Sequence, residues 1–474
     1  MKKRLVLLLL SGWLAAGCGS DSSMLSFDAM QPPMDAMQPP MDVMQPPIDA
    51  APPLLDPELQ KRVDDAVKNI ESDTCFTQDD ISQCQWADYE VGPAQVNMAK
   101  STGEAILVID SLGAGFFPGL VRYRNRILGY YHVNGDNVEA QTLSVHLPKR
   151  LGDVLVSFAG PEFIPASALS SIARATGPFY HKLNLLFPGH GGIVFGHLVD
   201  LVPEQPLVLL DNTQFSDIPR EVCQGIDNET LRAATAHKAA LAASLKQVMR
   251  DHNVRFINAS FGDTAATLAA QWSTQCGGAV PNAEQLQQLL HAYDPLYDLL
   301  FNSEGIIAAH ASANLGNPAD FPFDQANAQF PNQVRIGFIS SLASGLDAAG
   351  RGSPHIAEQF PVDGDADVYL NWGCEVTGGP PLCADPHYQL TETYGLTTTT
   401  VPLMSSSYID PLALARLVNL RYANHPGEPM SNTLIQVLKQ ELTPPLCGVD
   451  GTQPCVYQDP VVHQQLEIYR LHYK

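Results

Sequence analysis

The sequence predicts an α/β fold in which a mostly parallel central sheet carries helices on both faces. Three observations lead to this expectation. Short apolar runs such as 105–110 and 206–211 do not alternate with polar residues, which is typical of strands buried on both sides. Longer amphipathic segments such as 231–253 separate these runs, as in a sheet built from strand–helix–strand units. The chain also has 474 residues, 45% of them apolar, which is enough for a large core.

The start of the chain, residues 1–18, has the features of an export signal. Lys2, Lys3 and Arg4 precede an apolar run that is too short to span a bilayer as a stable helix. The run ends in LAAGC, which resembles a bacterial lipobox and implies cleavage before Cys18 and lipidation of that cysteine. We therefore expect a lipid-anchored protein of the bacterial cell envelope, on the exported side of the outer membrane. The alternative is an ordinary signal peptide with an incidental cysteine.

A proline-rich repeat fills residues 19–56. Units of seven residues begin at Asp28, Asp35, Asp42 and Asp49, and each unit contains a Pro-Pro pair. Consecutive prolines exclude helix and favour an extended, polyproline-like chain. We expect a disordered linker that holds the globular part away from the membrane.

The globular part is expected to begin at residue 57. A small helical segment held by a disulfide is expected over 57–95, the main domain over 96–442, and a disulfide-held extension over 443–474. Apolar runs that end at a carboxylate or a turn predict strands at 105–110, 206–211, 254–262, 306–316, 333–342 and 365–373. Amphipathic spacing predicts helices at 57–72, 231–253, 283–305, 410–425 and 431–442.

The cysteines indicate disulfides. Apart from Cys18 the chain has eight cysteines, and an even number in an exported protein is typical of paired cysteines. We pair them in sequential order. The expected disulfides are Cys75–Cys84, Cys223–Cys276, Cys374–Cys383 and Cys447–Cys455.

The charge balance narrows the class of partner. Lys and Arg total 27 against 50 Asp and Glu, a formal net charge of −23. Such an acidic surface argues against nucleic acid and anionic lipid as partners. It is compatible with structural calcium, but the sequence predicts no set of metal ligands. We expect a monomer that requires no cofactor.

The candidate site residues lie where functional sites form in such sheets, at the carboxyl ends of strands. Asp110, Ser260 and Asn314 follow strands, and His190 and Ser407 come just before helices. Asp110, His190 and Ser407 stand in one of the three known chain orders of a Ser-His-Asp triad. Singly, each of these residues also suits a turn, a loop or a helix cap. Their joint order is what indicates catalysis.

Motifs around these residues resemble those of subtilisin-like serine proteases. IDSLG at 109–113 is similar to the family's Asp-(Ser/Thr)-Gly, HGGIVFG at 190–196 to His-Gly-Thr-His-Val-Ala-Gly, and SFG at 260–262 to Ser-Leu-Gly. SANLG at 312–316 resembles Ala-Gly-Asn-x-Gly, and SSSYIDP at 405–411 resembles Gly-Thr-Ser-Met-Ala-Ser-Pro. The resemblance implies a three-layer subtilisin-like sandwich.

The resemblance also implies a membrane-tethered serine endopeptidase that acts on protein or peptide substrates. Asp110 would orient His190, which would take the proton of Ser407 as that hydroxyl attacks a peptide carbonyl. Asn314 would donate a hydrogen bond to the oxyanion. The glycines beside His190 would leave room for the substrate backbone. The residues expected to pair with an extended substrate, as an added strand, are Ser260, Phe261 and Gly262.

Departures from the family pattern leave the activity open. Ile193 stands at the family's second histidine, and Ser405 replaces the glycine two residues before the nucleophile. The long spacing between the first two triad residues indicates an insertion at 125–180 beside the cleft. The alternative function is therefore a catalytically impaired pseudoprotease, a surface module that binds peptides or serves as a scaffold. A third hypothesis is a cysteine hydrolase that uses His190 with Cys374.

Overall fold

The computed structural model divides the chain into two units, Met1–Ala51 and Pro52–Lys474, and the description below concerns the second. The structure describes residues 56–77, 82, 84–97, 103–112, 117–158, 171–172, 175–176, 189–202, 205–311, 323, 330–339, 351–352, 366–371, 389–390, 399–400, 406–442 and 456–457. The predictions for the lipidation site Cys18, the oxyanion donor Asn314 and the linker up to residue 55 lie outside the described residues.

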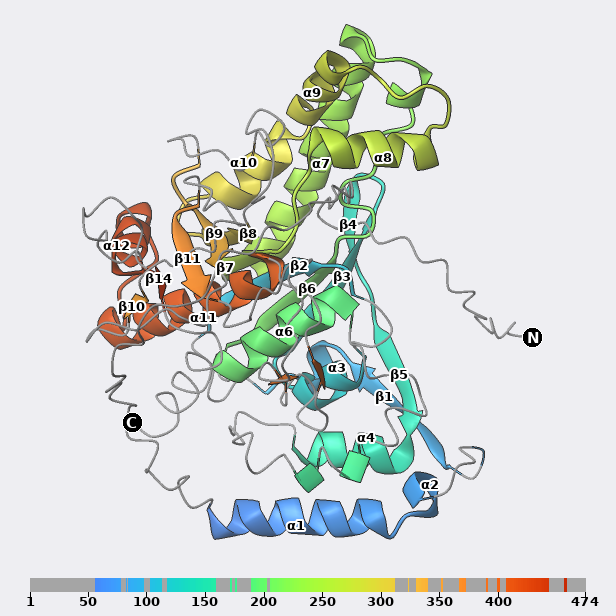
Figure 1. Ribbon diagram of the computed structural model, residues 1–474, viewed down its shortest axis with the longest axis vertical. Helices are drawn as coiled ribbons and strands as arrows, with labels where there is room; N and C mark the ends of the chain where they lie inside the picture. Colours follow the sequence, from blue (N-terminus) through green and yellow to red (C-terminus); the bar gives the residue numbers. More distant parts are fainter. Residues whose placement is uncertain are drawn as a thin grey trace, which may run out of the picture. The chain divides into compact units, whose positions relative to one another are not determined.

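A ten-stranded sheet forms the centre of the described part (Figure 1). From edge to edge, its strands are β10 (Arg351–Gly352), β14 (Val456–Tyr457), β11 (Val368–Asn371), β9 (Gln333–Ile339), β8 (Ile307–Ala311), β7 (Val254–Ala259), β2 (Ala105–Asp110), β6 (Leu207–Asp211), β3 (Ile127–Asn134) and β4 (Asn137–Ala140). Neighbouring strands from β14 to β3 are parallel, and β10 and β4 pair antiparallel at the two edges. The predicted α/β class with a mostly parallel sheet is confirmed.

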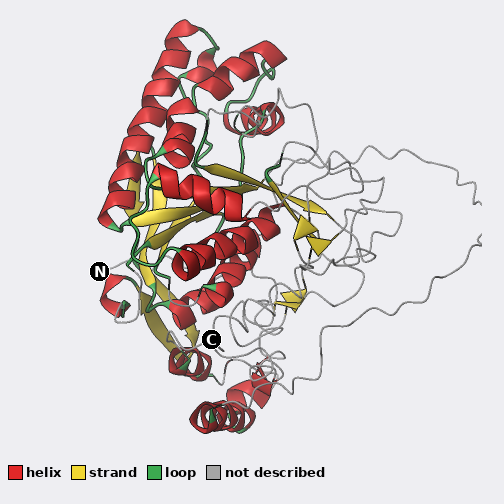
Figure 2. Cartoon of the chain, turned by 90° about the vertical axis from the view of Figure 1, so that its left-hand side faces the viewer, coloured by secondary structure: helices red, strands yellow, loops and turns green. Residues whose placement is uncertain are grey.

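Helices cover both faces of this sheet (Figure 2). The helices of the described part are α1 (Pro57–Glu71), α2 (Thr74–Thr77), α3 (Phe117–Tyr123), α4 (Lys149–Ser157), α6 (Gly189–Leu201), α7 (Asn228–Asp251), α8 (Ala265–Gln275), α9 (Ala283–His291), α10 (Asp294–Asn302), α11 (Ser406–Asn424) and α12 (Asn432–Leu442). Helices α6 and α11 contribute to the apolar core on one face, and α7 and α10 to the core on the other. This arrangement is a three-layer α/β structure.

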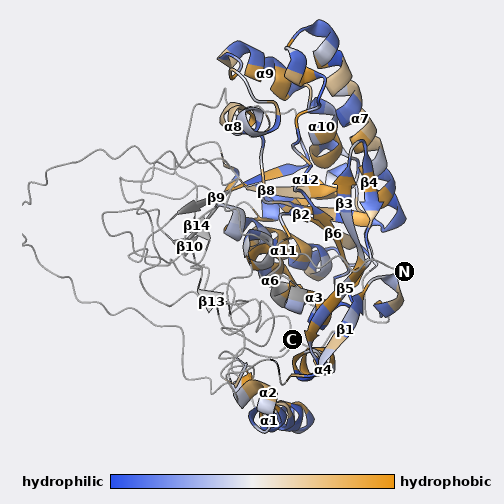
Figure 3. Cartoon of the chain, turned by 90° about the vertical axis from the view of Figure 1, so that its right-hand side faces the viewer, coloured by the Kyte–Doolittle hydropathy of each residue, from blue (hydrophilic) through white to orange (hydrophobic). Residues whose placement is uncertain are grey.

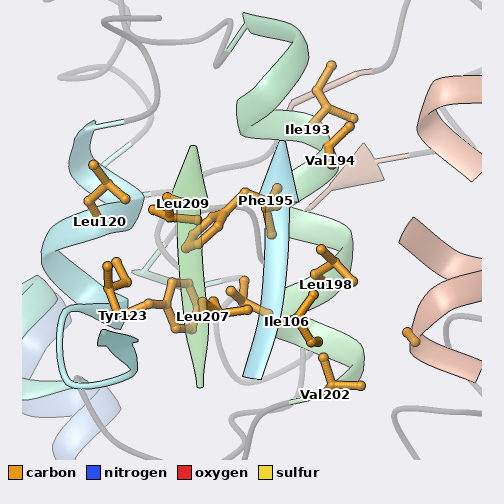
Figure 4. Close-up of a cluster of buried hydrophobic side chains, with 14 of the residues drawn as sticks. Ile106, Leu120, Tyr123, Ile193, Val194, Phe195, Leu198, Val202, Leu207 and Leu209 are labelled. Atoms are coloured by element: carbon orange, nitrogen blue, oxygen red, sulfur yellow. The ribbon is translucent and has the colours of Figure 1, made fainter. Parts of the chain in front are cut away.

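The side chains of β2 alternate between the two cores. Ile106 and Val108 pack with α6 and α11, whereas Leu107 and Ile109 pack with α7 and α10. Figure 4 shows Phe195 of α6 lying against β6 and β2, and in Figure 3 the central strands are mostly coloured as hydrophobic. Because both faces are covered, every position of the strand is buried, which explains its unbroken apolar run.

The chain changes direction across the sheet at β2 and β7. After β2 it moves to β3 on one side, and after β7 it moves to β8 on the other. Two adjacent strands whose connections leave in opposite directions form a topological switch point, and ligands bind outside the carboxyl ends of such strands. Asp110 is the last residue of β2, and Ala259 is the last residue of β7. The fold therefore places Asp110 where a site is expected.

Several predicted elements differ from the structure. Helix α11 begins at Ser406 instead of residue 410, so Ser407 lies in its first turn and not before it. The helix predicted at 283–305 is two helices, α9 and α10, and Pro295 lies in the first turn of α10. Proline has no backbone N–H to continue the preceding helix, but it suits a first turn. Strand β7 ends at Ala259 rather than at residue 262, and the side chain of the next residue, Ser260, hydrogen-bonds to α11.

The stretch predicted as an insertion at 125–180 contributes to the sheet itself. Its residues 127–140 form β3 and β4, so the prediction of an insertion beside the cleft is wrong for this part. The physical reason is that β3 pairs in parallel with β6 and is a full strand of the central sheet. Outside this sheet, two ribbons pair antiparallel: β1 (Trp86–Val91) with β5 (Leu143–Pro148), and β12 (Gln389–Leu390) with β13 (Thr399–Thr400).

Two of the four predicted disulfides are present. Cys75 is bonded to Cys84 and Cys223 to Cys276, with Cα–Cα distances of 4.7 Å and 4.9 Å. The first ties α2 to the start of the β1–β5 ribbon, and the second ties the loop before α7 to the end of α8. The cysteines of the other two predicted pairs lie outside the described residues; they are Cys374, Cys383, Cys447 and Cys455.

Candidate functional site

Asp110 and His190 form a hydrogen-bonded pair at the carboxyl end of β2. The Asp110 side chain is buried, with 1% of its surface exposed, and its Oδ1 accepts a hydrogen bond from the Ser111 backbone N–H at 2.7 Å. The same oxygen lies 2.8 Å from Nδ1 of His190, which is the second residue of α6. An ionised carboxylate can only accept, so Nδ1 donates and Nε2 is left as the acceptor of a neutral ring.

Gly191 allows α6 to approach the end of β2 closely enough for this pair to form. Its backbone N–H donates to the Ser111 carbonyl at 3.2 Å. A Cβ at Gly191 would lie 2.4 Å from that carbonyl oxygen and 3.1 Å from Oδ1 of Asp110. This glycine is therefore needed for packing between α6 and β2. The expectation that it leaves room for a substrate backbone does not describe its position.

The His190 ring combines burial with partial access. Burial lowers the pKa of His190, but the negative charge of Asp110 and the hydrogen bond to it outweigh burial, so the pKa is raised above its ordinary value of 6.5. One third of the side chain (33%) is exposed. A partly exposed imidazole with raised basicity and one fixed tautomer suits proton transfer.

The start of α11 lies beside His190. The Tyr408 ring is 5.1 Å from the His190 ring, centroid to centroid, and the Tyr408 carbonyl accepts a 2.7 Å hydrogen bond from Nδ1 of His197. Burial lowers the pKa of His197 to about 4, so this ring is neutral at physiological pH. Two histidines of α6, seven residues apart in the chain, thus hold the same tyrosine of α11.

Ser407 is buried next to this contact, with 0% of its surface exposed. Its hydroxyl donates to the Ser260 carbonyl at 3.4 Å, and the Ser260 hydroxyl donates to the Ser407 carbonyl at 3.0 Å. The structure thus brings Ser407 to the edge of the sheet that holds Asp110 and His190. In this arrangement the Ser407 hydroxyl points at a backbone carbonyl after β7.

The three residues predicted to pair with substrate differ in accessibility. Ser260 is buried, and its hydroxyl is used by α11. The Phe261 carbonyl accepts a 2.9 Å hydrogen bond from Nε2 of His310, and the Phe261 ring packs against Phe215. Gly262 is exposed. Strand pairing with a peptide stays a prediction: Phe261 is partly buried, and Gly262 is the most exposed of the three.

Two further polar residues of this site, Asp410 and Asn258, were not predicted from the sequence. Asp410 is fully buried, and its Oδ2 accepts a 3.2 Å hydrogen bond from the Ser260 hydroxyl, which also receives a 2.8 Å bond from Nδ2 of Asn258. Burial, and then the charge of Asp110, raise the pKa of Asp410 well above its ordinary value. A carboxylate three residues after Ser407, on the same helix face, is a signal that could have found Asp410.

Neither a metal centre nor a membrane-spanning helix occurs in the described part of the chain. Within those residues, no three His, Cys, Asp or Glu side chains are grouped so that they could hold a metal ion. Over the same residues, no helix combines the length and apolar character needed to cross a bilayer.

Comparison with known proteins adds no assignment: no protein-family model, no curated protein and no solved structure matches the chain.

Proposed function

We propose that the chain is a subtilisin-like serine endopeptidase, anchored to the bacterial cell envelope through lipid on Cys18. The observation that carries this proposal is the 2.8 Å contact between Asp110 and His190 at the switch point of a parallel sheet, with Ser407 at the same edge. In a Ser-His-Asp triad a buried carboxylate holds the imidazole in the correct tautomer and orientation, which is what Asp110 does for His190 here. The chain order Asp110, His190, Ser407 supports the same assignment.

In the proposed mechanism His190 acts as the general base. Asp110 holds the Nδ1–H tautomer, so Nε2 accepts the proton of the Ser407 hydroxyl as its oxygen attacks the peptide carbonyl. The negative charge of Asp110 stabilises the imidazolium that forms, which agrees with the direction of the His190 pKa shift. The imidazolium then protonates the leaving amine, and a water molecule repeats the sequence on the acyl-enzyme. Asn314 is the proposed oxyanion donor, worth about 10²–10³ in turnover.

One rearrangement is required before attack. The Ser407 hydroxyl donates to the Ser260 carbonyl at 3.4 Å, and it must leave this carbonyl and turn to Nε2 of His190 before it can attack. A neutral hydrogen bond of this length contributes at most about 1 kcal/mol. Apo active sites often have such loose contacts, which tighten when substrate binds.

A pseudoprotease is the second candidate, and a specific observation favours it. Ser407 is fully buried, and the Tyr408 ring lies 5.1 Å from the His190 ring, so a bulky side chain stands beside the base. If Tyr408 keeps substrates from reaching Ser407, the same edge would bind peptide without cleaving it. The two candidates differ in whether Ser407 reacts.

Covalent labelling of the serine tests the proposal. A fluorophosphonate probe reacts with a serine that a neighbouring histidine activates. We expect labelling of the wild type, loss of labelling in Ser407→Ala and His190→Ala, and unchanged labelling in Ser406→Ala. Ser406 is the matched control, because it is buried, adjacent in sequence and in the same helix. Equal labelling of wild type and Ser407→Ala would exclude Ser407 as nucleophile. Absence of labelling, together with binding of a peptide, would favour the pseudoprotease.

A further inference from the structure

A buried histidine on β8 holds the segment that follows β7, and the proposed triad does not use it. His310 is 2% exposed, and its Nε2 lies 2.9 Å from the Phe261 carbonyl oxygen. A carbonyl oxygen can only accept, so Nε2 carries the hydrogen and donates it. Burial lowers the pKa of His310 to about 4, so the ring is neutral at physiological pH.

Gln333 of β9 fixes this tautomer of His310. The buried Gln333 side chain donates from its Nε2 to the Phe323 carbonyl at 2.8 Å and to Nδ1 of His310 at 2.8 Å. Both N–H groups of the amide are therefore used. Because a donor faces Nδ1, a hydrogen on that nitrogen would be repelled, and the ring carries its hydrogen on Nε2. The two side chains together hold the Phe261 carbonyl in one direction.

The Phe261 carbonyl and the Gly262 N–H belong to the same peptide group. This group is trans, and in a trans peptide the C=O and the N–H lie in one plane and point in opposite directions. A donor that fixes the Phe261 carbonyl thus directs the Gly262 N–H away from His310. Gly262 is exposed, and among the residues that the structure describes its N–H has no hydrogen-bond partner.

The residues before and after this peptide group are held by other contacts. The Ser260 hydroxyl donates to a backbone carbonyl of α11 at 3.0 Å, and the Asp263 N–H donates to the Tyr297 hydroxyl at 2.9 Å. The backbone is therefore fixed on both sides of Gly262. An exposed N–H on a backbone held in this way can donate to a carbonyl of an extended peptide, as an edge strand does.

We propose that His310 and Gln333 are positioning residues that orient the Gly262 N–H to donate a hydrogen bond to a backbone carbonyl of an extended peptide. This inference rests on the proposed function, because it assigns how the peptide-binding segment of that site is held. His310 and Gln333 act through the Phe261 peptide group and do not touch the substrate. Because main-chain hydrogen bonds give affinity whatever the side chains are, the substrate class is an unfolded or extended polypeptide.

Two substitutions separate the donor from the shape of the ring. His310→Phe keeps an aromatic ring beside Phe301, whose centroid lies 4.9 Å from that of His310, but it has no donor for the Phe261 carbonyl. His310→Gln carries a side-chain N–H that can replace Nε2. Tyr89→Phe is the matched control. Tyr89 is a buried residue of β1, outside the central sheet, and its hydroxyl donates to the Lys149 carbonyl at 2.7 Å.

The readout is binding of fluorescein-labelled oxidised insulin B chain, an unfolded peptide, to full-length Ser407→Ala, followed by fluorescence anisotropy. Ser407→Ala lacks the proposed nucleophile, so the peptide is not cut during the measurement. Adding His310→Phe should raise the Kd about tenfold, the effect of losing one hydrogen bond between protein and peptide. Adding His310→Gln should restore most of the affinity, and adding Tyr89→Phe should leave the Kd unchanged.

A second measurement does not depend on the folding of His310→Phe. Hydrogen exchange of the Gly262 N–H in Ser407→Ala, measured by mass spectrometry, should slow when the B chain binds, because the amide becomes hydrogen-bonded. Unchanged exchange at Gly262 in the complex overturns the proposal. It is also overturned if His310→Phe leaves the Kd unchanged, or if His310→Gln or Tyr89→Phe weakens binding as much as His310→Phe does.

The outcome for this inference is separate from the outcome for the proposed function, because binding needs no turnover. If Ser407→Ala does not bind the B chain, the positioning role is wrong even where the fluorophosphonate probe labels Ser407. If the B chain binds as expected and the probe labels nothing, the positioning role stands and only the peptidase is removed.

Discussion

The close approach of Gly191 to the Ser111 carbonyl predicts that Gly191→Ala lowers both stability and catalytic rate. The new Cβ would lie 2.4 Å from the Ser111 carbonyl oxygen, against an ordinary contact of 3.4 Å or more, so α6 must move away from β2 by about 1 Å. Overpacking of this kind costs about 1–3 kcal/mol in the free energy of unfolding. A 1 Å displacement of a catalytic group costs up to about 10²-fold in rate. The displaced group here is His190, the neighbour of Gly191 and the proposed general base.

Two assays separate these effects. Urea unfolding measures the loss of stability, and hydrolysis of a peptide substrate measures kcat, with the Asp110–His190 hydrogen bond followed through the His190 ring titration. Gly92→Ala is the control, because a Cβ there meets no atom within 4 Å and the backbone is extended at φ 172°. If Gly191→Ala and Gly92→Ala have the same stability, the same kcat and the same His190 titration, the close approach of α6 to β2 does not determine the geometry of the site.

Three further predictions concern the carboxylate, acid stability and the disulfides. Asp110→Asn should keep the fold and lower kcat about 10⁴-fold, because the amide favours the wrong tautomer of His190. An unchanged kcat would show that Asp110 is not a member of the proposed triad. The free energy of unfolding should fall by about 3 kcal/mol between pH 6.5 and pH 4. The reason is that His197, whose pKa is lowered to about 4 in the folded protein, takes up its proton more readily in the unfolded chain. Urea unfolding of His197→Gln should show a smaller decrease over that range. Removing the Cys223–Cys276 disulfide, with a sequence separation of 53, should lower the free energy of unfolding by about 4 kcal/mol. Removing Cys75–Cys84, with a separation of 9, should lower it by about 2.5 kcal/mol. If thermal unfolding shows the larger loss for Cys75–Cys84, the loop-entropy explanation is contradicted.

The parts of the fold that the sequence predicts best are those whose burial is uniform. Strand β2 occupies the predicted 105–110, since a strand covered on both faces needs an apolar side chain at every position. Strand β3, by contrast, is buried unevenly beside the sheet edge, and its stretch suggests an insertion rather than a strand. The break between α9 and α10 depends on Pro295, which an amphipathic pattern read over 283–305 does not reveal.

The candidate site was predictable where chain order and the ends of strands and helices together mark its residues. Asp110 and His190 stand at the end of a strand and the start of a helix, and the structure joins them. The partners of Ser260 could not be predicted in this way, since it contacts Ser407 and Asp410 across 147 and 150 residues of chain. Hydrogen bonds between such distant residues depend on the packing of α11 against β7, which leaves no local pattern in the sequence.

The two halves of the proposed triad differ in how far the protein prepares them before substrate arrives. Asp110 and His190 are fixed by β2, by the Gly191 contact and by a 2.8 Å hydrogen bond, so their geometry requires no reorganisation. Ser407 is held by its backbone, whose carbonyl accepts from Ser260, while its own hydroxyl makes a 3.4 Å bond that costs little to break. The side chain that must move in the proposed mechanism is therefore the nucleophile, and because Ser407 is fully buried, a substrate must also gain access to it at the start of α11.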